Sequence, residues 1–199
     1  MFIELTDHLR CPADHEEQFL VLLPGAVIDR SVQTGDLGCP VCGREFRIRN
    51  SVLDFGDAPG SEPEPSALDA DAAVALLGVS GPGGYVALVG GAAAMHLGLS
   101  ERLDGVSLVA VNPPRDVAAT GSRLSVLRAA MLPLKAGSMR AVLLGPGYGG
   151  DPRWVENAAR VVLPGLRVVG EGTSPAASGL DILASVEGCW VGARATGRF

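Results

Sequence analysis

The sequence predicts an α/β protein in which a mostly parallel sheet with an antiparallel edge hairpin follows a small β-rich module. Apolar runs alternate with helical segments after residue 66, whereas three of the four cysteines lie in the first 42 residues. Between these parts, DAPGSEPEPS has the composition of a linker. We therefore place a first module at residues 1–57, a linker at 58–65 and a second module at 66–199, and we expect two separately packed cores.

Composition and charge exclude several classes of function. Of the 199 residues 47% are hydrophobic, which is enough for a buried core. The 16 basic and 22 acidic residues leave a net charge of −6, which argues against a surface that holds nucleic acid directly. The longest apolar run, residues 86–99, is shorter than the about 20 residues of a membrane-spanning helix. We expect a cytoplasmic protein, not a membrane protein, whose partner is another protein or a second copy of the chain.

The first module contains a metal-binding sequence pattern. Cys39 and Cys42 form a Cys-x-x-Cys knuckle, and Gly43 allows the backbone N–H groups to turn toward the sulfur atoms without a Cβ clash. The surrounding sequence predicts a hairpin with the knuckle at its turn. A second hairpin is predicted upstream, with its turn at Pro24-Gly25. Two hairpins that carry metal ligands indicate a zinc ribbon.

The upstream knuckle is incomplete, because Asp14 and then His15 follow Cys11 where a second cysteine is expected. Zinc accepts carboxylate or imidazole as well as thiolate. We predict a zinc site whose ligands are Cys11, Cys39, Cys42 and either Asp14 or His15. The alternative is that this knuckle has lost its metal and Cys11 is a buried apolar residue. A module of this size buries little apolar surface, which favours the metal.

The stretches LTDHLRCPADH and LGCPVCGREFRIRNSVLDF resemble the small zinc-ribbon family that activates methyltransferases of the translation machinery. The same module also occurs fused in front of methyltransferase domains. The family repeats Cys-Pro-x-Cys, and this chain departs from it at Asp14 and again after Ile48, where Ser51-Val52-Leu53 replaces Gly-Ile-Pro. The resemblance implies a module that docks on a methyltransferase fold.

The second module has the signals of alternating strands and helices. A helix is predicted over 66–79, with Ser66 as its N-cap and Gly78 near its C-terminal end. Residues 85–90 are an unbroken apolar run, as is typical of a buried parallel strand. The same reasoning predicts a helix at 92–103, strands at 106–112, 123–129 and 139–145, a helix at 154–163, and strands at 166–172, 180–186 and 189–195. The consecutive strands at the end predict the antiparallel hairpin.

This order resembles the class I S-adenosylmethionine-dependent methyltransferase fold, a Rossmann-like sheet, over residues 66–199. The match is strongest in LRAAMLPLKAGSMRAVLLG and WVENAARVVLPGLRVVGEG. The family has Asp-Ala-x-x-Leu-Pro-Phe-x-x-x-Ser-Phe-Asp-x-Val in the first stretch and Ala-x-Arg-Val-Leu-x-Pro-Gly-Gly-x-Leu-x-Val in the second, and both align without a gap. The resemblance implies this fold, and with it a cofactor site at the ends of the first strands.

The residues with which the family binds S-adenosylmethionine are mostly replaced. The family's first strand ends in Asp/Glu-x-Gly-x-Gly-x-Gly, and the aligned residues here are Leu88, Gly90, Ala92 and Ala94. Asn112 replaces the acid that binds the ribose hydroxyls, and Arg128 replaces the acid at the adenine amine. Together these changes cost about 4–6 kcal/mol, or about a thousandfold or more in affinity. We expect S-adenosylmethionine to bind weakly or not at all.

Three hypotheses for the function follow, and we assign no catalytic residues. The first is a degenerate, non-catalytic methyltransferase-like protein that acts as a binding or scaffold subunit. The second is an active methyltransferase with an atypical cofactor site. The third is a zinc-ribbon adaptor that activates a separate methyltransferase. A measurement of S-adenosylmethionine binding distinguishes the first two.

Overall fold

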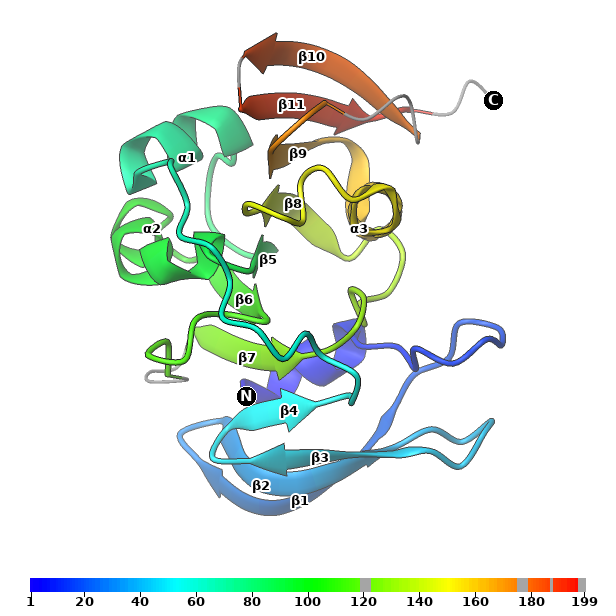
Figure 1. Ribbon diagram of the computed structural model, residues 1–199. Helices are drawn as coiled ribbons and strands as arrows, with labels where there is room; N and C mark the ends of the chain where they lie inside the picture. Colours follow the sequence, from blue (N-terminus) through cyan, green and yellow to red (C-terminus); the bar gives the residue numbers. More distant parts are fainter. Residues whose placement is uncertain (119–122, 175–178, 187, 197–199) are drawn as a thin grey trace.

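A computed structural model describes residues 1–118, 123–174, 179–186 and 188–196. Its strands form one eleven-stranded sheet in the order β1-β2-β3-β4-β7-β6-β5-β8-β9-β11-β10 (Figure 1). The strands are β1 (Val21–Ile28), β2 (Ser31–Gly38), β3 (Glu45–Arg49), β4 (Val52–Asp54), β5 (Tyr85–Val89), β6 (Ser107–Val111), β7 (Leu124–Arg128), β8 (Met139–Leu144), β9 (Val162–Glu171), β10 (Leu180–Val186) and β11 (Cys189–Arg194). The helices are η1 (Ile3–His8), α1 (Ala70–Leu77), η2 (Ala92–Met95), α2 (His96–Arg102) and α3 (Pro152–Val161).

The middle of the sheet is parallel and its two ends are antiparallel. Strands β4, β7, β6, β5, β8 and β9 pair in parallel with their neighbours. Strands β9, β11 and β10 pair antiparallel at one end, and β1 to β4 do so at the other. Helices α1 and α2 pack on one face and α3 on the other (Figure 1). The predicted mixed α/β fold is confirmed, and none of the described helices is long and apolar enough to cross a membrane.

The first helix of the second module begins later than predicted. The carboxylate of Asp69 accepts a hydrogen bond from the Ala72 amide at 2.8 Å, so Asp69 is the N-cap and α1 starts at Ala70. The hydroxyl of Ser66, which was predicted to be the cap, donates to Glu171 at 2.7 Å instead. Its oxygen also accepts from the Leu68 amide at 3.2 Å, so this serine binds a distant carboxylate as well as the local backbone.

The predicted turn at Pro24-Gly25 is wrong. Strand β1 continues through these two residues, with register shifts between Pro24 and Val27. The chain reverses at Asp29 and Arg30, whose φ angles of 47° and 64° are those of a tight hairpin turn. Proline is tolerated in β1 because this strand lies at the edge of the sheet.

The two modules share one core, so the expectation of two separate cores is wrong. Strand β4 of the first module pairs with β7 of the second. One cluster of buried side chains includes Leu9 from the first module and Leu134 from the second, and these two residues also form an isolated β-bridge. The Arg10 amide donates to the Pro133 carbonyl at 3.0 Å. The module boundary in the sequence is therefore not a boundary in the packing.

Because of this shared core, we expect Leu9→Ala to destabilise the second module as well. Leu9 is fully buried, and truncation of such a residue costs about 2–5 kcal/mol. Both tryptophans, Trp154 and Trp190, lie in the second module, so their fluorescence during urea unfolding reports on it. We expect one transition with a lowered midpoint. Val41→Ala, at a residue that is 55% exposed, is the control that leaves the midpoint unchanged. If Leu9→Ala leaves the urea midpoint of the tryptophan fluorescence unchanged, the two modules unfold independently.

Candidate metal centre and cofactor cleft

Four side chains of the first module converge on one point. One ligand atom from each of Cys11, His15, Cys39 and Cys42 lies within 4.8 Å of the other three. The Sγ atoms of Cys11 and Cys42 are 3.7 Å apart, and Cys39 Sγ is 3.4 Å from His15 Nε2. In a tetrahedral site with metal–sulfur bonds of about 2.3 Å, neighbouring ligand atoms lie about 3.5–3.8 Å apart. The cluster therefore has the spacing needed to hold a tetrahedral metal ion.

The knuckle between β2 and β3 positions two of these ligands. Cys39 directly follows β2, and its amide donates to the Arg44 carbonyl at 2.9 Å. The Gly43 amide closes the turn by donating to the Cys39 carbonyl at 3.0 Å. Gly43 has a φ of 70°, a left-handed conformation that glycine adopts without strain. The predicted knuckle on a hairpin is confirmed.

His15, and not Asp14, completes the cluster. The Nδ1 atom of His15 lies 2.7 Å from the Glu16 carbonyl oxygen, which requires a proton on Nδ1. That hydrogen bond leaves the lone pair on Nε2, the atom that faces Cys39. Asp14 is exposed and does not belong to the cluster. Of the two alternatives left open by the sequence, the structure brings only His15 to the other ligands.

The thiols differ in how readily they ionise. The backbone N–H of Arg44 lowers the pKa of the exposed Cys42 thiol to about 7. Burial raises the pKa of the Cys11 thiol to about 11. Cys42 can therefore offer a thiolate near neutral pH, whereas Cys11 must lose its proton as a metal ion binds.

We expect the purified protein to contain one tetrahedrally bound metal ion per chain. Cys39→Ser and His15→Ala should each lower the metal content, because each removes one of four ligands. Asp14→Ala should keep the metal, since Asp14 lies outside the cluster. Elemental analysis after dialysis against a chelator measures all three variants. Metal content that follows Asp14 but not His15 would contradict the assignment.

The residues expected at the cofactor site lie at the carboxyl ends of three neighbouring strands. Leu88 is buried within β5, Gly90 follows that strand, and Ala92 and Ala94 lie in η2. Asn112 follows β6, and Arg128 is the last residue of β7. Ligands of open α/β sheets bind at this edge. The structure therefore brings the ends of β5, β6 and β7 together. Of the aligned residues, Leu88 is buried in the sheet and Ala94 is exposed to solvent.

The side chain of Asn112 is bound to the neighbouring backbone. Its Nδ2 donates to the Ala129 carbonyl at 2.8 Å, and its Oδ1 accepts from the Ala129 amide at 3.0 Å. Asn112 is 2% exposed and has a φ of 51°, a conformation that asparagine tolerates better than most residues. An aspartate would lack the N–H donor for this pair. The amide therefore extends the pairing of β6 with β7 beyond the ends of the strands.

The side chain of Tyr148 occupies the space above these strand ends. A Cβ atom added to Gly90 would lie 2.4 Å from the ring of Tyr148, so the ring packs directly on the glycine. Burial raises the pKa of the Tyr148 hydroxyl, while a hydrogen bond from Asn112 and the charge of Arg128 act in the opposite direction. The rings of Tyr148 and Trp154 pack edge to face, with their centroids 4.7 Å apart. Tyr148 therefore packs on Gly90, one of the positions that align with the family's cofactor site, and its hydroxyl senses Asn112 and Arg128 at two others.

The sequence signal for this arrangement was incomplete. The segment from Gly147 to Asp151 is a turn before α3, and Asp151 caps this helix by accepting from the Arg153 amide at 2.9 Å. The inward direction of Tyr148 was missed. The only hint was the aromatic residue between glycines after a buried strand, a pattern that does not reveal where the ring points.

The linker also runs along this edge of the sheet. Pro65 and Gly91 form a parallel β-bridge, and a Cβ atom on Gly91 would lie 1.9 Å from the Glu64 carbonyl oxygen. Tyr148 and Trp154, together with linker residues, line a cavity of about 490 Å³. The described linker therefore covers the loop that follows β5.

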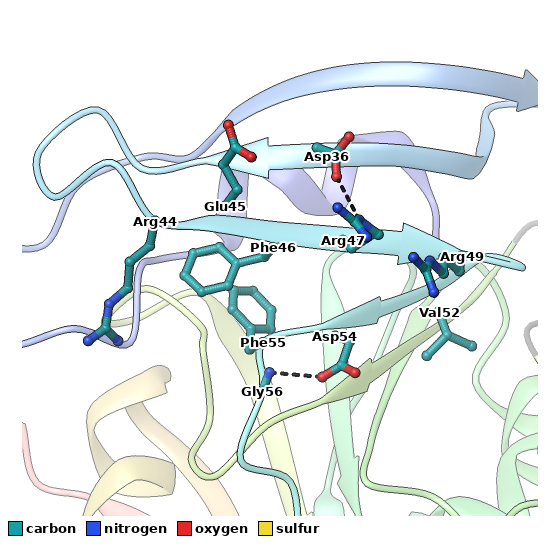
Figure 2. A pocket seen from close by; sticks show the side chains of 10 residues that line it. All are labelled: Asp36, Arg44, Glu45, Phe46, Arg47, Arg49, Val52, Asp54, Phe55 and Gly56. Atoms are coloured by element: carbon teal, nitrogen blue, oxygen red, sulfur yellow. Dashed lines mark hydrogen bonds and ion pairs between the residues drawn. The ribbon is translucent and has the colours of Figure 1, made fainter.

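A larger hollow of about 610 Å³ lies on the sheet of the first module (Figure 2). Figure 2 shows Arg47 directed toward Asp36, with Nε and Oδ1 3.5 Å apart, and Asp54 accepting a hydrogen bond from the Gly56 amide. The three basic and three acidic side chains that line the hollow balance each other: Arg44, Arg47, Arg49, Asp36, Glu45 and Asp54. With no excess of either charge, the hollow has no preference for an anionic or cationic ligand, and we assign it no function.

Comparison with known proteins identifies the class of fold. The chain has the fold of the class I S-adenosylmethionine-dependent methyltransferases, preceded by the Cys/His cluster. One similar structure is a complex between the Haloferax volcanii Trm112 methyltransferase activator and the putative methyltransferase, with 14% identity and a TM-score of 0.50 over 64% of this chain and 89% of that chain. At this identity the likeness establishes the fold alone. No family model and no curated protein match the sequence.

Two further solved structures are similar at lower scores. The antibiotic-resistance methyltransferase Kmr has 14% identity and a TM-score of 0.45 over 66% of this chain and 95% of that chain. The pyocyanin biosynthetic protein PhzM has 17% identity and a TM-score of 0.46 over 59% of this chain, which corresponds to 52% of its own length.

Proposed function

We propose that the protein is a degenerate methyltransferase-like subunit that binds or scaffolds other proteins and does not transfer methyl groups. The observation that supports this proposal is the position of Tyr148, whose ring packs on Gly90 and whose hydroxyl interacts with Asn112. A cofactor in this place would have to displace a ring that is only 9% exposed. It would also compete with Ala129 for the side chain of Asn112.

The chemistry of the replaced residues supports the same proposal. A ribose needs hydrogen-bond acceptors, and the Oδ1 of Asn112 already accepts from the Ala129 amide. Arg128 has only donors to offer an adenine amine, which is itself a donor. We therefore propose that S-adenosylmethionine is not a cofactor of this chain. Zinc is the metal proposed for the Cys/His cluster, because three thiolates and one imidazole are among the ligand sets it prefers.

The competing proposal is an active methyltransferase with an atypical cofactor site. It is favoured by the fold, since one similar structure is a complex that contains a putative methyltransferase. The adaptor proposal is weakened by the sheet: the strand β4 that a zinc-ribbon activator could offer to a separate enzyme is already paired with β7 of the same chain. Cofactor binding separates the two remaining proposals.

We expect S-adenosylmethionine to produce no heat of binding in isothermal titration and almost no thermal stabilisation at about 1 mM. A ligand stabilises a protein only when its concentration exceeds its dissociation constant. Tyr148→Ala is the informative variant, because it removes the ring from the strand ends while Asn112 and Arg128 remain. A rise of several degrees in the melting temperature of the unmodified protein at micromolar cofactor would overturn the proposal of a degenerate protein. It would favour the proposal of an active methyltransferase.

A protein partner is supported by an exposed apolar surface on the edge strand β1. Four apolar side chains of this strand are between 43% and 64% exposed: Val21, Leu23, Val27 and Ile28. Phe19, just before the strand, is 57% exposed. Exposed apolar side chains on an unpaired edge strand are a candidate interaction site. The first module also has ten acidic residues against five arginines, which favours a basic partner. The similar structure that contains an activator and a methyltransferase is itself a protein complex. The free thiols support a cytoplasmic location as part of this proposal.

We expect Leu23→Ser to lower partner recovery or self-association about tenfold without changing the unfolding midpoint, because Leu23 is 64% exposed and contributes little to the core. Leu97→Ser is the matched control, since Leu97 is also 64% exposed but lies on α2. Pull-down at two salt concentrations and light scattering measure both variants. Equal losses from the two substitutions, or recovery of RNA alone, would contradict a protein interface at β1.

A further inference from the structure

The linker crosses the carboxyl ends of several parallel strands in succession (Figure 1). Just before it, the Phe55 amide donates to the carbonyl of Arg128 at the end of β7 at 2.8 Å. Further along, Glu62 accepts a hydrogen bond at 2.9 Å from the amide of Arg115, in the loop that follows β6. We call residues 57–66 the strap. Its path follows the edge at which open α/β sheets bind ligands.

The far end of the strap is attached to β5 and β9. Pro65 pairs with Gly91 after β5. At the end of β9, the Glu171 carboxylate accepts hydrogen bonds from the Ser66 hydroxyl and the Ala67 amide, both at 2.7 Å. Glu171 is only 4% exposed. A carboxylate that is buried to this extent requires hydrogen-bond donors, and the two donors come from the strap and the residue that follows it.

The strap is held by polar contacts and not by burial. Every residue from 56 to 70 is exposed or half-buried, so the strap itself buries little apolar surface. The ion pair of Glu62 with Arg115 is solvent-exposed on both sides and contributes little. Segments with few buried apolar contacts open locally at low free-energy cost. The Glu171 carboxylate is therefore the strongest attachment of the strap.

We propose that the strap is a displaceable cover, latched by Glu171, over the ligand edge of the sheet. The strap and any ligand that reaches the ends of β5 to β7 then exclude each other, because the Glu64 carbonyl lies against Gly91. Opening leaves the Glu171 carboxylate without its two donors, so a closed strap is the resting state. This inference goes beyond the proposed function and holds whether or not S-adenosylmethionine binds.

Hydrogen–deuterium exchange of the full chain tests the latch. Ser66→Ala removes one of the two donors to Glu171, and the amides of residues 57–67 should exchange about tenfold faster while the chain stays folded. Ser61→Ala is the matched control, because Ser61 lies in the same strap and is exposed, without a hydrogen bond to Glu171. It should leave exchange unchanged.

Glu171→Gln provides the second variant. The glutamine keeps an acceptor oxygen but loses the charge, so strap exchange should again rise while exchange in β5 and β8 does not. Strap exchange that is equal in the unmodified protein, Ser66→Ala and a folded Glu171→Gln variant would overturn the latch. Since exchange is measured without any cofactor, this outcome is independent of the titration that tests the proposed function.

Discussion

The parallel pairing of β4 with β7 is the constraint on which the rest of the structure depends. Three residue pairs join the strands, from Val52 with Val126 to Asp54 with Arg128. The pairing extends the α/β sheet into the first module and covers what would be an exposed edge of β7. Because the pairing is parallel, β4 ends at the same side of the sheet as β7, β6 and β5. The chain that leaves β4 must therefore start at the ligand edge and cross it to reach α1.

The molecule's own segments lie along this edge of the sheet. The strap lies against Gly91, and Tyr148 from the loop after β8 packs on Gly90. Asn112 contributes both atoms of its amide to the backbone of Ala129. Groups that could recognise a small molecule are thus satisfied within the chain. A polar group that is already paired offers little to a ligand, because binding must first break the existing hydrogen bond.

The metal centre is coupled to the second module through its loop. Glu17, two residues after His15, accepts a hydrogen bond from the Ala136 amide at 3.0 Å and pairs with Arg160 at 3.3 Å. The Lys135 amide donates to the His8 carbonyl at 2.8 Å. A metal ion that orders Cys11 and His15 therefore also orders the segment that packs on the α/β sheet. A metal ion bound by the Cys/His cluster would support the interface between the modules in addition to the knuckles.

The sequence by itself determined the buried parallel strands of the second module, since apolar runs such as residues 85–90 are long enough to be buried on both faces. It also determined the Cys39–Cys42 knuckle, because this turn depends on residues close in the chain. Only the tertiary structure decided which residue joins the cysteines, where Tyr148 points and what Ser66 binds. In each case the partner is distant: Cys39 lies 24 residues from His15, and Glu171 lies 105 residues from Ser66. Local patterns contain no information about such distances, which are set by the pairing of strands into one sheet.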